Sequence, residues 1–378
     1  MNGKINDIET LRCFSIVAVI LQHIDNLFPH PVPLILKAKF YLGGGFGVDL
    51  FLTISGFLIA QSLIPQLEKA NTFTQKKQIT IHFWYRRMWR LWPAAWVCLG
   101  AILLCVIFFN ESQAFGSLAA NLDATIAGFF HFANIRLYNT FMQSEYGASF
   151  VYWSLSLEEQ FYFIFPILLI LIPRKKIIIS IILCIAIQLI IARDKHPLTI
   201  IFRTDAILLG ATIYYIHQKE MHLSAIKILL KIRKIYFYFS LAFSLLVMSL
   251  ITGGSIFVEY KYSYLAIISF FLVLTSSLNL NIFTPESWIK YAILWISERS
   301  YSIYLTHIPV YFFTQELIFK INKYGSLNLS NNYIYIAIAA LLVPLAAHCS
   351  YQYIENPLRT YGREKIIKNQ RKYLYEQS

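Results

Sequence analysis

The chain has 378 residues, of which 57% are hydrophobic and only 14% are Asp, Glu, Lys or Arg, against roughly 25% charged residues in a soluble domain. This composition excludes a soluble globule, and the 30 Phe, 25 Tyr and 7 Trp exclude a solvated disordered chain. The net charge of +13 fits either a nucleic acid or a membrane surface as partner, so the positions of the basic residues must decide.

Apolar runs near the length of about twenty residues that a helix needs to cross a bilayer recur along the chain. They lie at roughly residues 8–28, 45–64, 92–110, 155–172, 176–192, 198–217, 235–252, 262–281, 292–318 and 332–353. The runs are continuously apolar and too long for the alternating strands of a membrane barrel. The sequence therefore predicts an all-α polytopic integral membrane protein with about ten transmembrane helices.

The basic residues favour one orientation of these helices. If the N-terminus is cytoplasmic, 22 of the 33 Lys and Arg residues fall in cytoplasmic segments and 8 in outer segments, with Arg12, Arg203 and Arg299 inside spans. This positive-inside bias predicts that both termini are cytoplasmic. We expect one transmembrane domain at 1–357 and a basic, solvated or headgroup-facing cytoplasmic tail at 358–378. No basic stripe follows a phosphate backbone, so no nucleic-acid partner is expected.

One moderately apolar segment, residues 115–135, does not fit as a further span. It contains Asn121, Asp123 and His131, and a span here would place every later basic loop outside. We therefore expect residues 111–153 to form a long extracytoplasmic loop with a surface or re-entrant helix, and loops of this length tend to be functional.

The first two spans carry charges that a bilayer tolerates poorly. Arg12 and His23 are eleven residues apart, which places them on one helix face about 16 Å apart along the axis. The structural alternative is that Arg12 extends its charge to the membrane surface and that His23 is a hydrogen-bonded core residue, neither having a functional role. In the second span, GGGFGVDLFLTISGFLI, the glycines permit close helix packing, whereas Asp49 near the outer end is harder to explain structurally.

A basic cluster precedes the third span in the segment HFWYRRMWRLWP. Arg87, Arg90 and Pro93 are spaced by three, with Arg86 four residues before Arg90. On a helix these arginines share a face and offer bidentate donors at headgroup depth, which suits a phosphate. Membrane anchoring with a tryptophan belt is the structural alternative.

The fourth span starts as VYWSLSLEEQFYFIFP and is expected to hold Glu158 and Glu159 in its first turn. There the helix dipole favours carboxylates, and Ser154 or Ser156 would cap the helix. Capping alone is one explanation of these residues, and a catalytic carboxylate is the other.

Two later spans also hold polar groups at membrane depth. FRTDAILLG places Arg203 and Asp205 in the outer third of the sixth span, where they are candidates for a pair. SERSYSIYLTHIP directs Ser300, Tyr304 and His307 along one face of the ninth span. The five cysteines lie in apolar stretches without metal-ligand spacing, so no metal is expected.

Together these motifs resemble the membrane-bound acyltransferase 3 family, the O-acyltransferases of bacterial surface polysaccharides. The matching elements are Arg12 and His23 in the first span, GVDLFLTISGFLI, RRMWRLWP, WSLSLEEQFYFIFP, FRTDAILLG, SYSIYLTHIP and YIENP. They are collinear from about residue 8 to residue 357. No SGNH domain follows the last predicted span, so the sequence resembles the stand-alone members.

The resemblance implies transfer of an acetyl group from cytoplasmic acetyl-CoA, the acyl donor, to a hydroxyl of an extracytoplasmic surface polysaccharide or lipid-linked glycan. O-antigen, capsule and other exopolysaccharides are the expected acceptors, and the bacterial inner membrane is the expected location. His23 matches the essential first-span histidine of the family and Arg12 its partner. Arg87 and Arg90, with Pro93, match its Arg-x-x-Arg-x-x-Pro motif, and Glu158 matches the Glu of WSLSLE.

The expected mechanism places the donor phosphates on Arg87, Arg90 and Arg12, with the thioester near His23. His23 accepts the proton of the acceptor hydroxyl, and either Asp49 or Glu158 orients its ring. Candidate oxyanion or sugar contacts are Arg203, Tyr304 and His307. A covalent acyl-enzyme is an open alternative, and a proton-coupled transporter or polysaccharide flippase is the rival function.

Overall fold

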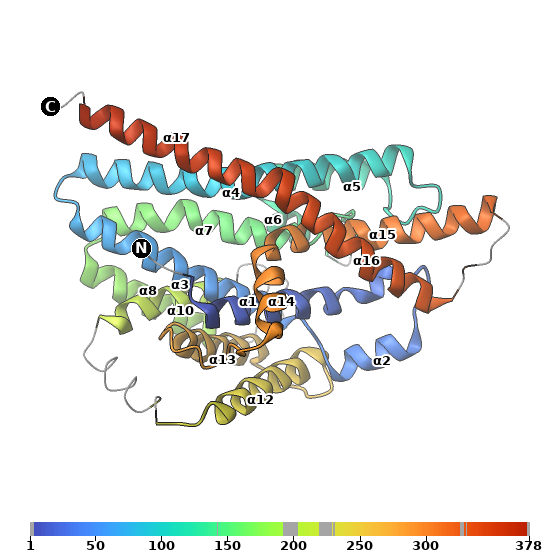
Figure 1. Ribbon diagram of the computed structural model, residues 1–378, viewed down its shortest axis with the longest axis horizontal. Helices are drawn as coiled ribbons and strands as arrows, with labels where there is room; N and C mark the ends of the chain where they lie inside the picture. Colours follow the sequence, from blue (N-terminus) through green and yellow to red (C-terminus); the bar gives the residue numbers. More distant parts are fainter. Residues whose placement is uncertain are drawn as a thin grey trace. The chain divides into compact units, whose positions relative to one another are not determined.

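A computed structural model describes residues 4–141, 143–191, 203–218, 229, 231–325, 329 and 331–375. Throughout these ranges the regular structure is helical, without strands (Figure 1). The all-α expectation is thus confirmed for the described part of the chain. The helices form two compact units, the first built from residues 1–25, 30–62 and 173–300, and the second from 26–29, 63–172 and 301–378.

The first unit surrounds an apolar core. Its helices are α1 (Asn6–Gln22), α2 (Pro33–Tyr41), most of α3 (Phe46–Lys69), α8 (Arg174–Leu189), α10 (Asp205–His217), α12 (Lys234–Gly253), α13 (Lys261–Ser276) and α14 (Trp288–Glu298). Helix α13 packs against α1, α8, α10 and α12. Fully buried Leu50, Phe57, Met248 and Leu265 belong to this core. Truncating one of these side chains would leave a cavity and lower the free energy of unfolding, because the core is close-packed.

Helix α3 approaches its neighbours closely because glycine lies at the contacts. A Cβ on Gly56 would lie 1.9 Å from the backbone oxygen of Ile207 in α10, and one on Gly210 would lie 2.0 Å from that of Thr53. Small residues let helix backbones meet in this way. The packing explanation of the α3 glycines is therefore supported at Gly56.

A buried carboxylate organises the turn before α14. Asp7, at the start of α1, is fully buried and accepts hydrogen bonds from the backbone N–H groups of Ile282, Phe283 and Thr284 at 2.9–3.0 Å. The Thr284 hydroxyl donates to the same carboxylate at 2.7 Å. Such donors offset the cost of burying the charge.

The second unit is built along a long helix. Its helices are α4 (Phe73–Phe108), α5 (Leu118–Phe129), α6 (Ala133–Thr140), α7 (Tyr152–Leu171), α15 (Ser300–Tyr324), α16 (Asn332–Ser350), the π-helical turn η3 (Tyr351–Glu355) and α17 (Asn356–Tyr375), with the 3₁₀ turn η1 (Ile24–Leu27) at its border. Thr72 and Gln75 form a capping box at the start of α4. Helix α7 contacts α4 through the Tyr152 hydroxyl, which donates to the Ala95 oxygen at 2.9 Å.

Several expectations about the elements need correction. The span expected at 292–318 is interrupted, since α14 ends at Glu298 and α15 begins at Ser300. The tail beyond residue 357 is not simply solvated, because α17 lies along α4 with Gly362 and Ile366 buried (Figure 1). Helix α2 was not expected. Residues 192 and 198–202 of two expected spans, and 376–378 of the expected tail, lie outside the described residues.

Five helices among the described residues are long and apolar enough to cross a membrane. They are Phe46–Lys69, Phe73–Phe108, Tyr152–Leu171, Lys234–Gly253 and the continuous helical stretch Asn332–Ile366. Other helices at expected spans are shorter, with 17 residues in α1 and 16 each in α8 and α13. The chain is a multi-pass membrane protein, and the number of ten spans and the orientation of the termini stay predictions.

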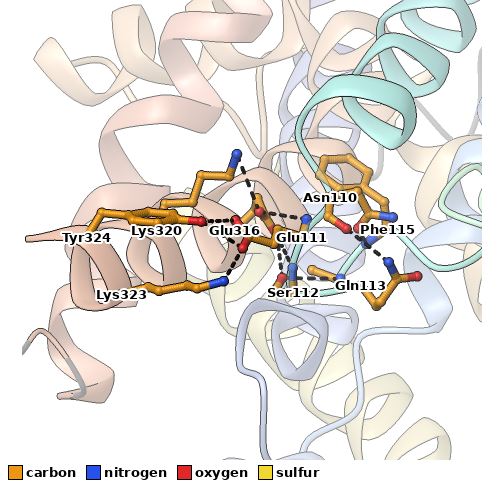
Figure 2. A network of polar contacts seen from close by, with 10 residues as sticks. Asn110, Glu111, Ser112, Gln113, Phe115, Glu316, Lys320, Lys323 and Tyr324 are labelled. Atoms are coloured by element: carbon orange, nitrogen blue, oxygen red, sulfur yellow. Dashed lines mark hydrogen bonds and ion pairs between the residues drawn. The ribbon is translucent and has the colours of Figure 1, made fainter.

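The segment expected as an outer loop, 111–153, contains helices α5 and α6 and is tied to α15 (Figure 2). Fully buried Glu316 of α15 accepts hydrogen bonds from the backbone N–H groups of Glu111 and Ser112 at 2.9 and 2.8 Å. Glu111 in turn accepts hydrogen bonds from Lys323 and from the hydroxyl of Tyr324. Two carboxylates therefore fasten the turn that follows α4.

The α3–α10 contact gives a stability prediction. We expect Gly56→Ala to lower the free energy of unfolding by about 1–3 kcal/mol, because its Cβ overlaps the Ile207 carbonyl and forces the backbones apart. The measurement is denaturant unfolding of the full chain in detergent micelles. Gly100→Ala in α4 is the matched control, since no atom lies within 4 Å of its Cβ and alanine favours helix. Equal stability of the two variants would contradict the close approach.

The Glu111 contacts give a pH prediction. Hydrogen bonds from Lys323 and then Tyr324 lower the pKa of Glu111 from its ordinary value. A lowered folded-state pKa stabilises the fold above the unfolded-state pKa of about 4.3, and the contribution disappears as the pH falls through the folded-state pKa.

We therefore expect the wild type to be more stable than Glu111→Gln at pH 7, with the two converging once the pH has fallen below the lowered folded-state pKa of Glu111. Thermal unfolding in detergent at a series of pH values measures the difference. Glu364→Gln, at an exposed position of α17, is the control. A difference that persists undiminished in acid would show that the Glu111 charge is not its source.

Candidate functional site

The first unit holds a buried ion pair between two of the expected site residues. Asp49, in the first turn of α3, accepts a hydrogen bond from Arg203, which lies just before α10. The Arg203 guanidinium also lies 4.3 Å from the ring centroid of Tyr262 on α13. Both charged side chains are at most 5% exposed. Asp205 was a candidate partner of Arg203, and the ion pair observed here joins Arg203 to Asp49.

Helix α1 carries the other two expected residues of this unit. Arg12 forms an ion pair with Glu9, its Nη1 donating to the two carboxylate oxygens at 2.9 and 2.7 Å. The Ser297 hydroxyl donates to Glu9 as well. His23 lies one residue beyond the last residue of α1, where its backbone N–H donates to Ile20 and Val19. Helix α1 therefore ends at Gln22 with His23 as its C-cap residue, and a 3₁₀ turn follows, so the span expected at 8–28 is not one continuous α-helix.

The second unit groups a cation, two aromatic rings and a carboxylate. The Arg87 guanidinium lies 4.9 Å from the ring centroid of Tyr162 and 5.5 Å from that of Phe83. The Tyr162 hydroxyl donates to Glu158, one helical turn earlier on α7. Glu158 is 4% exposed. An arginine stacked on aromatic rings keeps its planar fork in a fixed orientation, which suits bidentate recognition of phosphate or carboxylate.

Neighbouring residues of the same helices extend this group. The Trp92 indole donates to Glu159 at 3.3 Å, and the Trp84 indole donates to the Tyr162 backbone oxygen at 3.0 Å. The Nε of Arg90 is buried and finds no hydrogen-bond acceptor among the described residues. Arg87 and Arg90 therefore lie three residues apart on α4 as the sequence spacing predicted, with Arg87 held by α7.

Helix α15 contributes Tyr304 and His307. The Tyr304 hydroxyl donates to the Val151 oxygen at 2.8 Å and shares a hydrogen bond with Ser154 at 2.7 Å. His307 is fully buried, and its Nδ1 lies 2.8 Å from the Tyr304 backbone oxygen. These contacts place a phenol, a hydroxyl and an imidazole together at the start of α7.

The expected capping role of the α7 serines is wrong. Helix α7 begins at Tyr152 without a side-chain cap, so Glu158 and Glu159 lie in its second turn rather than its first. Ser154 instead contacts Tyr304, and Ser156 accepts a hydrogen bond from the Ala133 backbone at 3.1 Å. Capping is thus excluded as the reason for two buried carboxylates at these positions.

The expected site residues divide between the two units. Arg12, His23, Asp49 and Arg203 belong to the first, and Arg87, Arg90, Glu158, Tyr304 and His307 belong to the second. Within a unit, the structure brings Asp49 to Arg203, and Arg87 to Glu158 through Tyr162. The described residues contain no group of three or more His, Cys, Asp or Glu side chains that could hold a metal ion.

Several hydrogen-bond, ion-pair and aromatic partners of these residues were not predicted from the sequence. Tyr162 lies four residues after Glu158, and Glu9 lies three residues before Arg12, so helical spacing alone could have pointed to both. Tyr262 lies 59 positions from Arg203, and no local pattern links them. The YIENP motif is explained by Glu355, which accepts a hydrogen bond from Ser302 of α15 at 2.8 Å.

Comparison with curated proteins finds related O-acetyltransferases. The chain is 26% identical to the peptidoglycan O-acetyltransferase OatA of Listeria monocytogenes, over 94% of this chain and 56% of that protein. It is 28% identical to the O-acetyltransferase OatA of Staphylococcus aureus, over 94% and 57%. A putative peptidoglycan O-acetyltransferase of Bacillus subtilis, YrhL, is 25% identical over 94% and 55%.

The chain thus spans a little over half the length of the curated relatives it matches. No solved structure matches it significantly. The family model described as an acyltransferase domain matches residues 5–351, which is nearly the whole chain and includes every expected site residue. The chain therefore belongs to the acyltransferase 3 family.

Proposed function

We propose that the protein is a transmembrane O-acyltransferase that moves an acetyl group from cytoplasmic acetyl-CoA to a hydroxyl of an extracytoplasmic glycan. The family match supports acyl transfer, and the names of the relatives support an O-acetyl product on a cell-surface polysaccharide. The observation that carries the proposal is the buried group of Arg87, Tyr162 and Glu158, because it combines an oriented cation with a carboxylate inside an apolar helix bundle.

The acetyl-CoA phosphates are assigned to Arg87 and Arg90. Arg87 is oriented by the Tyr162 and Phe83 rings, and the buried Arg90 Nε finds no acceptor among the described residues. Both offer the planar donors that phosphate oxygens accept in pairs. Arg12 is the third proposed contact, and a phosphate there would compete with Glu9 for the guanidinium.

The proposed reaction needs one base. The acceptor hydroxyl oxygen attacks the thioester carbonyl while His23 takes the hydroxyl proton, and collapse of the tetrahedral intermediate breaks the carbon–sulfur bond. The coenzyme A thiolate leaves and receives the proton from His23, so the histidine returns to its neutral form. A neutral imidazole suits this role because one of its ring nitrogens can accept a proton and later return it.

The supporting roles follow from the contacts of the remaining candidates. Asp49 is held by Arg203 and Glu158 by Tyr162, so each carboxylate that is proposed to orient His23 is itself fixed in place. Tyr304 and His307, with Arg203, are the proposed oxyanion or sugar contacts. The proposed location is the bacterial inner membrane with both termini cytoplasmic, and peptidoglycan, O-antigen or capsule is the acceptor.

The test of this function replaces His23. We expect His23→Ala to reduce acetyl transfer from acetyl-CoA to surface glycan by about a hundredfold or more, since general-base catalysis contributes about 10²–10⁴. Base-labile acetate on the glycan, measured by mass spectrometry of membranes supplied with labelled acetyl-CoA, reports the reaction. The exposed His30→Ala variant is the control.

Full activity of a well-folded His23→Ala protein would refute the base assignment. Movement of glycan across the membrane that depends on a proton gradient, together with no binding of acetyl-CoA, would refute the acyltransferase in favour of a transporter. A protonophore added to the assay separates these two functions, because the proposed reaction needs no gradient.

A second prediction concerns Arg87. Lysine keeps the charge but lacks the planar fork and its stacking on Tyr162, so we expect Arg87→Lys to raise the KM for acetyl-CoA by roughly tenfold. The KM for the acceptor should change little. Arg363→Lys, at an exposed position of α17, is the matched control. An unchanged KM for acetyl-CoA would show that Arg87 does not hold the donor.

A further inference from the structure

A pocket of about 450 Å³ lies in the second unit, away from the arginine cluster of α4. Its walls are the turn at residues 113–116, the end of α6 and the segment 144–150, with Phe312 of α15 and Asn26 completing it. This volume falls within the range of small-molecule sites, roughly 300–1,000 Å³. None of the expected site residues lines it.

The chemistry of the lining selects a class of ligand. Aromatic side chains, among them Phe141 and Phe150, alternate with uncharged polar ones such as Gln113, Ser144 and Asn26. Among the described residues, no Lys or Arg lines the pocket, so these residues offer no cation to the phosphates of an acyl donor. Aromatic faces together with amide and hydroxyl groups suit a ligand that has both apolar C–H faces and hydroxyls.

The one carboxylate among the described lining residues, that of Glu145, already has a structural role. Glu145 accepts hydrogen bonds from the Ser117 backbone N–H at 3.0 and 3.3 Å, which joins segment 144–150 to the start of α5. A cationic ligand would have to compete with this contact. The lining therefore favours an uncharged polyhydroxylated ligand over an anion or a cation.

The walls are held in place before any ligand binds. The Asn121 amide, 1% exposed, donates to the Phe115 and Ser117 oxygens and accepts from the Ala148 N–H. Arg136 donates to the Ala120 and Tyr146 oxygens at 3.1 Å. Binding to a preorganised site costs less conformational entropy than ordering a loose one.

The turn that follows α4 and one glycine also hold the pocket walls in place. Glu316 fastens the backbone at Glu111 and Ser112, directly before the turn at 113–116 (Figure 2). Gly147 has φ +105°, a conformation that other residues rarely adopt, and a Cβ there would lie 3.0 Å from the Asn121 amide oxygen. The pocket shape thus depends on contacts between elements that are distant in sequence.

Part of the pocket wall lies directly before α7, the helix that carries the candidate carboxylate Glu158. Segment 144–150 is followed by α7, which begins at Tyr152. Glu158 lies six residues further along, about 9 Å at 1.5 Å per residue. Ser154, between them, contacts Tyr304. A chain of sugar units seated in the pocket could therefore present a neighbouring hydroxyl toward Glu158.

The geometry points to a binding site for an uncharged sugar residue of the acceptor glycan in this pocket, with Phe141 as the stacking platform and Gln113 and Ser144 as hydrogen-bonding groups. Phe141 lines the pocket and is 45% exposed, so its ring is accessible to a ligand. This inference rests on the proposed function for the identity of the ligand as acceptor.

The test measures binding without any acyl transfer. Full-length protein in detergent micelles is titrated with chitotetraose, an uncharged N-acetylglucosamine oligomer, and separately with coenzyme A, by calorimetry and saturation-transfer NMR. We expect chitotetraose to bind and Phe141→Ala to weaken it by roughly tenfold or more. Coenzyme A binding should be unchanged.

Two further variants keep the result interpretable. Ser144→Trp fills the pocket from an exposed position and should also abolish chitotetraose binding. Tyr138→Ala removes an aromatic ring of α6 that is 41% exposed but does not line the pocket, so it should bind as the wild type does. Thermal unfolding in detergent verifies that each variant is folded.

The outcomes separate this inference from the proposed function. Chitotetraose binding that is absent in the wild type, or unchanged in both pocket variants, overturns the sugar site even if acetyl transfer is intact. Weaker coenzyme A binding in Phe141→Ala overturns it in favour of a donor site. Loss of chitotetraose binding in the pocket variants upholds the sugar site, even if the wild type transfers no acetyl group.

Discussion

The requirement that every buried charge be compensated shapes both units of this protein. Leaving an ion unpaired in an apolar helix bundle costs several kcal/mol, so a buried carboxylate fixes whatever donates to it. Asp7 fixes the turn before α14 through three backbone N–H groups, and Glu316 fixes the turn after α4 through two. In both cases a helix holds an irregular segment in a defined place. Turns between helices are otherwise the parts with the fewest constraints.

The same requirement accounts for the candidate reactive groups. Asp49 is paired with Arg203, and Glu158 accepts from Tyr162, whose ring supports Arg87. Each of these side chains has its orientation restricted by a partner on another helix or one turn away. Restricted orientation is what acid–base catalysis and phosphate recognition both need. A contact that stabilises the fold can therefore also orient a side chain for catalysis or ligand binding.

Hydropathy located the apolar part of each of the five helices that are long enough to cross a membrane, because burial in a bilayer requires long apolar runs regardless of tertiary structure. It could not predict α17, whose polar sequence becomes helical against α4, or the break at Arg299. Of the candidate site, the spacing of Arg87 and Arg90 was readable, since it is a property of one helix. The Arg203 partner was not, because Asp49 is 154 residues away and only folding brings the two together. For the serines of α7, a local rule predicted helix capping, and tertiary contacts overrode it. Ser154 shares a hydrogen bond with Tyr304, and Ser156 accepts one from the Ala133 backbone.

Helix α4 separates the arginine cluster of the second unit from the pocket of that unit. From Arg87 to its last residue, Phe108, it runs about 32 Å at 1.5 Å per residue, close to the hydrocarbon thickness of about 30 Å. Cationic side chains lie toward one end of this span, and the pocket, whose described lining holds no cation, begins five residues beyond the other. An acyl donor with phosphates and an acceptor with hydroxyls would therefore be recognised at opposite ends of one helix. The arginines favour an anionic ligand at the first end, and the described pocket lining, which has a carboxylate but no cation, disfavours one at the second. In the proposed reaction, transfer between these two ends depends on how far the arm of the donor extends along the helix bundle.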